Sequence, residues 1–316
     1  MTRSPGAHRT VETGQPGRAG RAGRAGRAGR AGQLGRAGRV ALSVAVVGAV
    51  VWLLAAMQVV GPASGAYLSR VTNSINTAAT NPYFTCRAAV VGEAGTTAYL
   101  AYPMGEASGT TAADVSGNAR PGVYTAAGVT YNQPGPCPRD TPASTAVTLN
   151  GSTGYLSGPA TALTGPNVFS VEIWFRTTVA GGKLIGFGNA STGASGSYDR
   201  HLYIDTGGRL VFGVYPNAVK TISSTTTVTD GRWHHAVGTL SPAGQFLYLD
   251  GQPVASNPAV TTAQAFTGYW RIGYDNLNGW TNAPTNAFFT GSLAWAATYS
   301  YALTPTQVAT HDAAGR

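Results

Sequence analysis

Charged side chains are scarce in this 316-residue chain, at 10% of the sequence, whereas glycine occurs 43 times. This composition disfavours long solvated helices and suits short strands joined by turns. The sequence also lacks a Gly-x-Ser-x-Gly nucleophile elbow and a phosphate-binding Gly-x-x-x-x-Gly-Lys-Ser/Thr loop. Nothing in it therefore indicates a serine hydrolase of that type or a P-loop nucleotide hydrolase.

Positive charge is concentrated at the N-terminus. Residues 1–39 contain nine Arg and a single acid, Glu12, so the rest of the chain is nearly neutral despite a net charge of +9. Nucleic-acid binding needs a basic face on the folded part, and we therefore expect no nucleic-acid partner. Residues 17–31 are five copies of Gly-Arg-Ala, too poor in apolar bulk to fold, which predicts a disordered basic leader over 1–39. Attraction of this leader to anionic lipid is a second interpretation.

An uncharged apolar segment follows the leader. Residues 40–60 are long enough to cross a bilayer as one helix, and the Arg-rich flank places the rest of the chain outside. We therefore expect an exported protein. Ser64 and Ala66 are small residues at the −3 and −1 positions of a possible signal-peptidase site. The sequence around them resembles the cleavage region of secreted surface proteins from Gram-positive bacteria. The sequence leaves open whether the helix is a retained membrane anchor or is cleaved near Ala66.

The segment 61–98 is rich in small polar residues and predicts an extracellular stalk. It contains Cys86, and the other cysteine is Cys137. In an oxidising compartment two lone cysteines are most simply a disulfide, although two unpaired thiols are the alternative. The disulfide would tie the stalk to the globular part of the chain.

Alternating apolar and polar residues predict a series of β-strands after residue 99. Asp250-Gly251 predicts a tight hairpin, because glycine accepts the positive φ of such turns. Near the C-terminus, Thr304, Pro305 and Gln307 form a capping-box pattern that predicts a short final helix. The clearest strands are expected at 145–151, 154–157, 169–175, 201–205, 209–215, 232–240, 245–250, 269–274 and 288–299.

This ordered series resembles the laminin-G-like (concanavalin A-like) domains of bacterial surface and secreted proteins. The resemblance covers about two-thirds of the chain. It implies an all-β fold, an antiparallel double-sheet jelly-roll sandwich over residues 99–316, preceded by the disordered leader and one hydrophobic helix. The family usually binds and seldom catalyses.

Catalytic chemistry is not indicated. Retaining glucanases of this broad fold carry a Glu-x-Asp-x-x-Glu strand, which is absent here. Glu172, the only Glu after residue 106, is expected to be a sheet-surface residue. His234 and His235 are adjacent on a strand, so they point to opposite faces and cannot chelate one metal ion together. We therefore expect no enzymatic activity.

Calcium is the metal that the resemblance suggests, because laminin-G-like domains often bind it. The turn at 114–118 would supply Asp114 and Asn118 as oxygen ligands. Related domains carry Asp-Glu where this chain has Ala294 and Trp295, so two carboxylates are missing. The alternative is a turn in which Asp114 accepts backbone N–H bonds.

A polar loop at 275–286 is the candidate ligand site. Amide side chains pair with sugar hydroxyls and an exposed aromatic ring stacks on sugar faces. A second wall would come from residues 191–200. The candidate binding residues are Asp275, Asn276, Asn278, Trp280, Tyr198 and Arg200. In the alternative interpretation Trp280 covers a sheet edge and the Asn residues shape turns.

The sequence thus predicts a non-catalytic extracellular recognition module for carbohydrate or a glycosylated partner. One alternative is a structural or adhesive protein of the cell envelope that contacts another protein. The second is a polysaccharide hydrolase with an unrecognised site, which would depend on one of four acids: Glu172, Asp199, Asp205 or Asp275.

Overall fold

The computed structural model describes residues 71–72, 77–78, 85–92 and 97–316. The expected leader at 1–39, the apolar helix at 40–60 and the cleavage point at Ala66 lie outside these residues. No helix within the described part is long and apolar enough to cross a membrane. The described residues belong to one unit, Arg70–Arg316.

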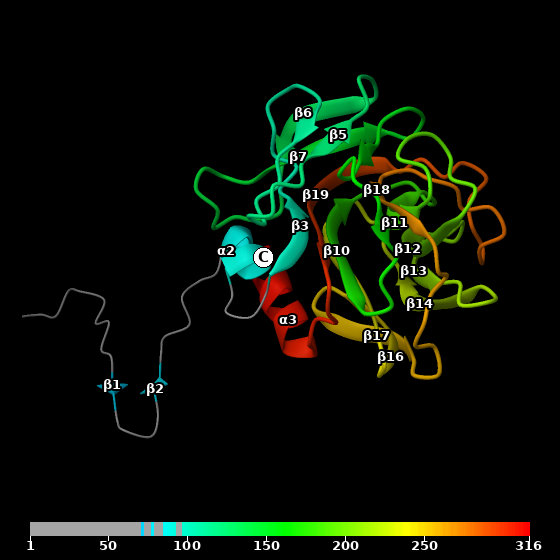
Figure 1. Cartoon of the computed structure of the whole chain (residues 1–316). Coiled ribbons are helices and arrows are strands. Elements are labelled where there is room, and N and C mark those ends of the chain that lie inside the picture. The colour runs from blue at the N-terminus through cyan, green and yellow to red at the C-terminus, as the bar shows by residue number, and fades with distance from the viewer. Residues whose placement is uncertain (1–70, 73–76, 79–84, 93–96) are drawn as a thin grey trace, which may run out of the picture. The chain divides into compact units, whose positions relative to one another are not determined.

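Antiparallel pairing builds an eight-stranded sheet (Figure 1). Its centre is β10, which pairs with β15 on one side and β19 on the other. In spatial order the strands are β17 (Gln252–Asn257), β16 (Gly244–Leu249), β15 (Trp233–Ser241), β10 (Phe169–Arg176), β19 (Thr290–Tyr299), β7 (Thr145–Asn150) and β6 (Val129–Pro134), with β3 (Ala98–Tyr102) also paired to β19.

A nine-stranded sheet faces the first. Its order is β14 (Lys220–Thr227), β13 (Arg209–Val214), β12 (Tyr198–Ile204), β11 (Lys183–Gly188), β18 (Thr267–Ile272), β8 (Leu156–Ser157), β5 (Gly122–Tyr124) and β4 (Thr111–Ala112), with β9 (Leu163–Thr164) paired to β18. A separate two-stranded pair joins β1 (Val71–Thr72) to β2 (Thr77–Ala78). The two large antiparallel sheets confirm the predicted jelly-roll sandwich.

The main hydrophobic core lies between the two sheets. Every second side chain of β10 points into it, and these four are fully buried: Phe169, Val171, Ile173 and Phe175. Phe169 meets Phe212 of the opposite sheet with ring centroids 6.1 Å apart. Each such side chain stabilises the fold by about 1.5–3 kcal/mol through burial. The period-2 pattern in the sequence therefore selects the face that the two sheets share.

Two local predictions are confirmed by backbone geometry. Asp250 and Gly251 have φ values of 53° and 74°, and they join β16 directly to β17. The final helix α3 (Pro305–Ala314) begins with Thr304 as N-cap, and Thr304 and Gln307 form the reciprocal capping box.

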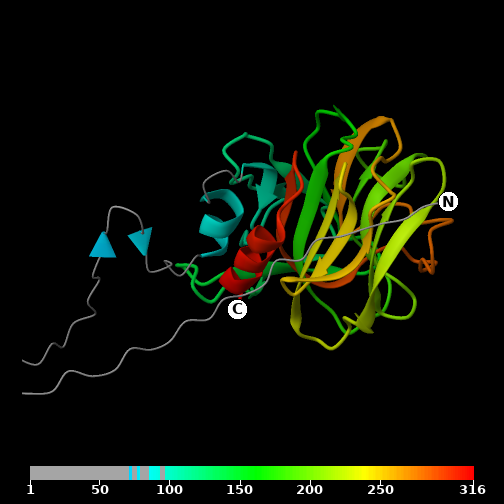
Figure 2. The ribbon, with the colours of Figure 1, turned by 90° about the horizontal axis from the view of Figure 1, so that it is seen from below.

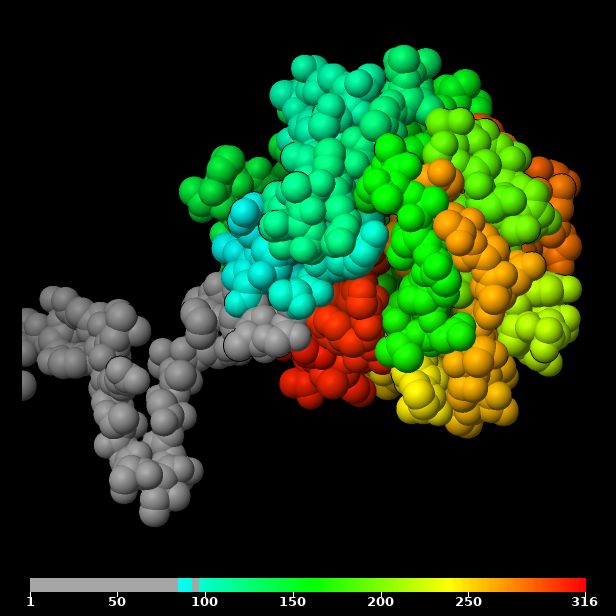
Figure 3. Space-filling view, in the orientation of Figure 1, coloured from blue at the N-terminus to red at the C-terminus, as the bar shows by residue number. Residues whose placement is uncertain are grey.

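The outer face of the eight-stranded sheet is covered by two helices. α2 (Cys86–Gly92) and α3 pack there with Trp174, Val237 and Tyr248 in a second apolar cluster. The two helices contact each other. Figure 2 shows both on the same side of the sandwich, and Figure 3 shows the red surface of the C-terminal residues at the same side of the molecule as the cyan surface of the first described ones. Because of this cover, β10 is buried on both faces rather than half-buried as its alternation suggested.

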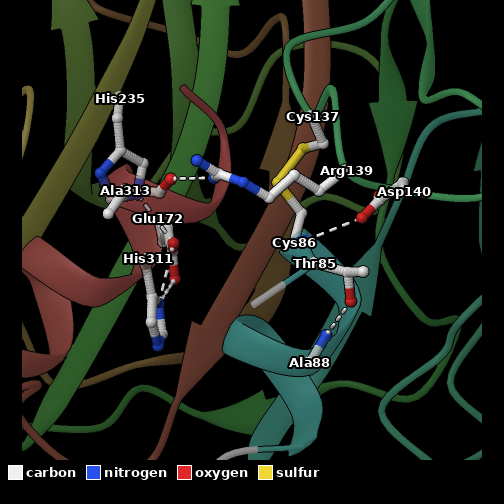
Figure 4. Close-up of a disulfide and its surroundings, with 10 residues drawn as sticks. All are labelled: Thr85, Cys86, Ala88, Cys137, Arg139, Asp140, Glu172, His235, His311 and Ala313. Carbon is white, nitrogen blue, oxygen red and sulfur yellow. Dashed lines mark hydrogen bonds and ion pairs between the residues drawn. A yellow bond between two sulfur atoms is a disulfide. The ribbon is translucent and has the colours of Figure 1, made fainter. Parts of the chain in front are cut away.

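The expected domain boundary at residue 99 is too far along the chain. Cys86, Ala89 and Val90 of α2 are buried in the second cluster, so residues 86–92 belong to the folded domain rather than to a stalk. The disulfide between Cys86 and Cys137 is present, as predicted, and joins α2 to the segment after β6 (Figure 4). The backbone N–H of Cys86 also donates a hydrogen bond to Asp140. The disulfide and this hydrogen bond together hold the start of α2 in place.

Glu172 is not a sheet-surface residue, and that prediction is wrong. The side chain is fully buried beneath α3, where His235 Nε2 donates a 2.8 Å hydrogen bond to the carboxylate and His311 Nδ1 lies 3.0 Å from it. Tyr299 of β19 donates a hydrogen bond of 2.7 Å to the same carboxylate. Burial alone would raise the pKa of Glu172, but the charge of His311 and the hydrogen bonds from both histidines hold it below its ordinary value. Figure 4 shows His311 of α3 pointing toward Glu172 of β10.

We predict that Glu172→Gln lowers stability at neutral pH, by about 3 kcal/mol, because the histidines lose a buried ionised partner. Since the folded-state pKa of Glu172 lies below the unfolded one, its stabilisation is complete above about pH 5 and declines in acid. The difference between wild type and variant should therefore narrow from about pH 5 downward. Urea unfolding at a series of pH values measures this difference. A gap that stays constant from neutral to acidic pH would contradict the role given to the charge.

Candidate functional site

An open groove lies at the rim of the nine-stranded sheet. Two tyrosines line it, Tyr198 at the start of β12 and Tyr215 just after β13. The hollow has a volume of about 410 Å³ and is called the tyrosine groove below. Its lining consists of Gly196, Ser197, Tyr198, Tyr215, Val219, Gln264, Asn278, Gly279 and Trp280. Sites for small molecules typically start at about 300 Å³, so the space suffices for a small polar ligand.

Trp280 forms the apolar floor of the groove and is not the exposed ring that the sequence suggested. Only 7% of its surface is accessible, and it packs with Tyr203 and Val211 in a third apolar cluster. Its ring meets that of His201 edge-on at 4.5 Å. It fits against the sheet because β13 has Gly213 at this point, where an added Cβ would come within 2.4 Å of the indole. Trp280 therefore packs over β12 and β13 instead of standing exposed.

The loop that carries Asn278 and Trp280 is fastened to the sheet through Asp275. This carboxylate is fully buried, accepts hydrogen bonds from the backbone N–H groups of Ser195 and Asn276, and lies 3.7 Å from Lys183 Nζ of β11. Lys183 also donates a 3.0 Å hydrogen bond to the backbone carbonyl of Asn276. Asp275 thus holds the loop that forms one wall of the groove, and it is not itself a lining residue.

The buried charges under the groove are electrostatically compensated. Burial lowers the pKa of Lys183 to about 8, against the opposing charge of Asp275. Burial, together with the charge of Lys183, holds the pKa of His201 well below its ordinary value. His201 is therefore neutral at neutral pH, and Lys183 is the cation that Asp275 balances.

Two further predicted binding residues also have structural roles. The side-chain amide of Asn276 donates to the backbone carbonyl of Ser195, and its oxygen accepts from the backbone N–H of Asn278. Arg200, fully buried, binds Asp199 at 3.2 Å and donates to the backbone carbonyls of Pro166 and Gln264. Both residues hold loops together around the groove without lining it.

Of the six predicted binding residues, the groove therefore brings together Tyr198, Asn278 and Trp280. The Tyr198 hydroxyl donates a 2.9 Å hydrogen bond to the backbone carbonyl of Asn278, which links the two walls. Sequence reasoning missed Tyr215 and Gln264. Tyr215 stood at the end of an expected strand, and Gln264 lies in a stretch without periodicity, so no local pattern marked either residue.

The turn proposed for calcium uses its oxygens within the protein. Asp114 Oδ1 accepts the backbone N–H groups of Ala101 and Ser116, and Oδ2 accepts the Ser116 hydroxyl and the backbone N–H of Arg120, all at 2.8–3.0 Å. The amide nitrogen of Asn118 donates to the backbone carbonyl of Ala98 at 2.9 Å. Both carboxylate oxygens of Asp114 thus accept hydrogen bonds within the protein, and Asp114 joins β3 to the turn, as the alternative interpretation expected.

One other group of residues in the described part has metal-ligand spacing, namely Cys86, Cys137 and Asp140. The two sulfurs are joined in the disulfide and are not thiolate ligands. The rings of His234 and His235 lie on opposite faces of β15, as predicted. His234 lies between Asp230 and Asp250 at 3.0 Å and 2.9 Å, whereas His235 contacts Glu172 on the opposite face.

The four acids on which a hydrolase would depend are all buried. Asp199 accepts the backbone N–H groups of Arg200, Tyr215 and Gln264, and Asp205 accepts those of Gly207 and Arg209. At most 4% of any of these four side chains is accessible. Each carboxylate therefore holds backbone or ionic partners inside the fold.

The two-sheet architecture with a groove at its rim defines a lectin-like jelly roll. The family model described as the concanavalin A-like lectin/glucanases superfamily matches residues 150–309, slightly more than half of the chain. The chain belongs to this superfamily, which confirms the resemblance inferred from its strands. No curated protein matches the sequence.

Several solved structures share part of this arrangement. The binding domain of Paraclostridial Mosquitocidal Protein 1 is 14% identical with a TM-score of 0.49, covering 67% of this chain and 51% of that one. Domain 4 of AbnA, a GH43 extracellular arabinanase from Geobacillus stearothermophilus in complex with arabinotriose, is 20% identical with a TM-score of 0.44, covering 68% and 97%. Trypanosoma rangeli sialidase is 16% identical with a TM-score of 0.46, covering 68% of this chain, and the chain spans only 32% of that protein's length.

We predict that Lys183→Met destabilises the protein by about 3 kcal/mol, because it leaves Asp275 buried without its cation. Adding Asp275→Asn should recover part of the loss, since the second change removes the uncompensated charge. Lys220, the other lysine of the chain, is exposed on β14, and Lys220→Met is the matched control, with a change within about 0.5 kcal/mol. Chemical unfolding compares the four proteins. Equal effects of the two lysine variants would contradict the role given to Lys183.

We predict that Asp114→Ala lowers the melting temperature equally in calcium and in chelator. The physical reason is the loss of an acceptor for the backbone N–H groups of Ala101 and Arg120, at about 1–3 kcal/mol in total. Thermal scans of wild type and variant in both conditions measure the effect. A calcium-dependent rise in the melting temperature of wild type that the variant lacks would restore the metal hypothesis.

Proposed function

We propose that this protein recognises carbohydrate, or a glycan-bearing partner, in the tyrosine groove and does so without catalysis. The observation that carries the proposal is the lining itself. It combines Tyr198 and Tyr215 with Gln264 and Asn278, next to the buried indole of Trp280. Aromatic rings stack on the apolar faces of sugars, and amides exchange hydrogen bonds with sugar hydroxyls. Membership of a superfamily of lectins and glucanases supports the same substrate class.

We base the proposal that the protein does not catalyse hydrolysis on where its acidic side chains lie and what they bind. Glycoside hydrolysis commonly uses two carboxyl groups that flank the scissile bond. The lining of the tyrosine groove contains no Asp or Glu. Glu172, Asp199, Asp205 and Asp275 are buried and held by partners in the fold, as described above. These observations favour recognition over hydrolysis.

The proposed setting is outside the cell. The Arg-rich segment 1–39 and the uncharged segment 40–60 form the sequence pattern of an exported chain with its C-terminal domain outside. The domain would be held at the membrane by residues 40–60 or released after cleavage near Ala66. The buried disulfide agrees with an oxidising compartment.

We predict that the full-length protein binds a soluble polysaccharide saturably and that Tyr215→Ala weakens binding at least about tenfold, through lost stacking. Asn278→Ala should weaken it by a similar factor, whereas Tyr215→Phe should retain most of the affinity. Affinity electrophoresis and isothermal titration against a polysaccharide panel provide the measurement.

Tyr269→Ala is the matched control, because Tyr269 is a half-buried tyrosine of β18 outside the groove lining. Its binding should equal that of wild type. Saturable binding that survives both Tyr215→Ala and Asn278→Ala would remove the site assignment. No saturable binding by any glycan, together with a protein recovered by surface crosslinking, would favour the adhesive or structural alternative.

A further inference from the structure

Three residues that line the tyrosine groove, Tyr215, Gln264 and Asn278, carry uncharged polar side-chain groups with no hydrogen-bond partner within the described residues. The side-chain amides of Gln264 and Asn278 and the hydroxyl of Tyr215 make no hydrogen bond there, although the backbone atoms of all three residues do. An amide offers both donors and an acceptor, and a phenol offers one of each. This set matches the hydroxyl groups of a sugar, which also donate and accept.

No cation is presented to a ligand in the groove. The lining contains no Lys, Arg or His. Two buried basic residues of the same sheet are already paired, Arg200 with Asp199 and Lys183 with Asp275, and all four side chains are fully buried. His201, also fully buried, has a strongly lowered pKa and carries no charge at neutral pH. A carboxylate or sulfate on a ligand would therefore lose its hydration without gaining an ionic partner.

Resting on the proposed function, we infer that the tyrosine groove selects neutral glycans and rejects acidic ones. Binding then depends on ring stacking against Tyr198 and Tyr215 and on neutral hydrogen bonds to Gln264 and Asn278. Such contacts are only weakly screened by salt, in contrast to ion pairs at a surface.

One exposed cation lies close to the groove along the chain and must be tested separately. Lys220 follows Val219, a lining residue, by one position, yet it is exposed and is not part of the lining. If acidic glycans bound at this rim, Lys220 would be the residue that attracts them. Lys220→Gln therefore separates attraction by the rim from recognition in the groove.

The experiment titrates the full-length protein with neutral polysaccharides (dextran, galactomannan and xylan) and acidic ones (polygalacturonate and hyaluronate) at low and high salt. We expect at least one neutral polymer to bind, with an affinity that changes less than about twofold with salt. Gln264→Ala and Tyr215→Ala should each weaken that binding, at least about fivefold for Gln264→Ala and tenfold for Tyr215→Ala. Lys220→Gln should leave it unchanged.

The outcomes separate the two proposals. Binding of acidic polymers only, lost in Tyr215→Ala, would overturn the neutral selectivity and leave carbohydrate recognition in the groove intact. Acidic polymers could also bind in a way that high salt or Lys220→Gln abolishes, while neutral polymers still need Tyr215. That result would show that Lys220 at the rim attracts the acidic polymers, and it would support the selectivity of the groove for neutral glycans. Failure of every polymer to bind would overturn both the selectivity and the proposed function.

Discussion

The arrangement of the eight-stranded sheet depends on one buried carboxylate. Glu172 sits on the central strand β10 and holds His235 of the neighbouring strand β15, Tyr299 of β19 and His311 of α3. A buried charge is costly unless it is paired. Because one partner of the carboxylate is on α3 and the others are on the sheet, keeping it paired holds the helix against the sheet. Once α3 covers this face, Trp174 beside Glu172 is buried as well, and α2 packs in the same apolar cluster under the constraint of the disulfide.

The opposite sheet applies the same principle to shape a surface. The pair Lys183 and Asp275 holds the loop that carries Asn278. The pair Asp199 and Arg200 holds the segment at Gln264 through hydrogen bonds to its backbone. These charges are paired with one another inside the fold, and the groove that they support is lined by aromatic and amide residues. Acids are scarce in this chain, and Glu172, Asp199, Asp205 and Asp275 all have partners inside the fold. The physical outcome is a groove lined by uncharged residues on a support of paired charges.

Much of the fold was predictable from periodicity. The alternation at 169–175, the Asp250-Gly251 turn and the capping box at Thr304 each depend on neighbours within a few residues, so the local pattern was sufficient. Among the longer strands, β6, β11 and β14 were missed: β11 is buried on both faces and shows no alternation, and β14 is a run of polar residues. The role of Glu172 was predicted wrongly, because nothing near it in the sequence shows that a helix 139 positions later will cover it.

By itself the sequence indicated most of the longer strands and the superfamily, favoured the pairing of Cys86 with Cys137, and separated an Arg-rich N-terminal segment from a nearly neutral remainder. These features follow from composition and short-range pattern. Only the tertiary structure decided that Trp280 is a floor rather than an exposed platform, that Asp275 and Arg200 are supports, and that Tyr215 and Gln264 complete the groove. The physical reason is that burial and ionic partnership depend on strands distant in sequence, and no local pattern encodes which of them become neighbours.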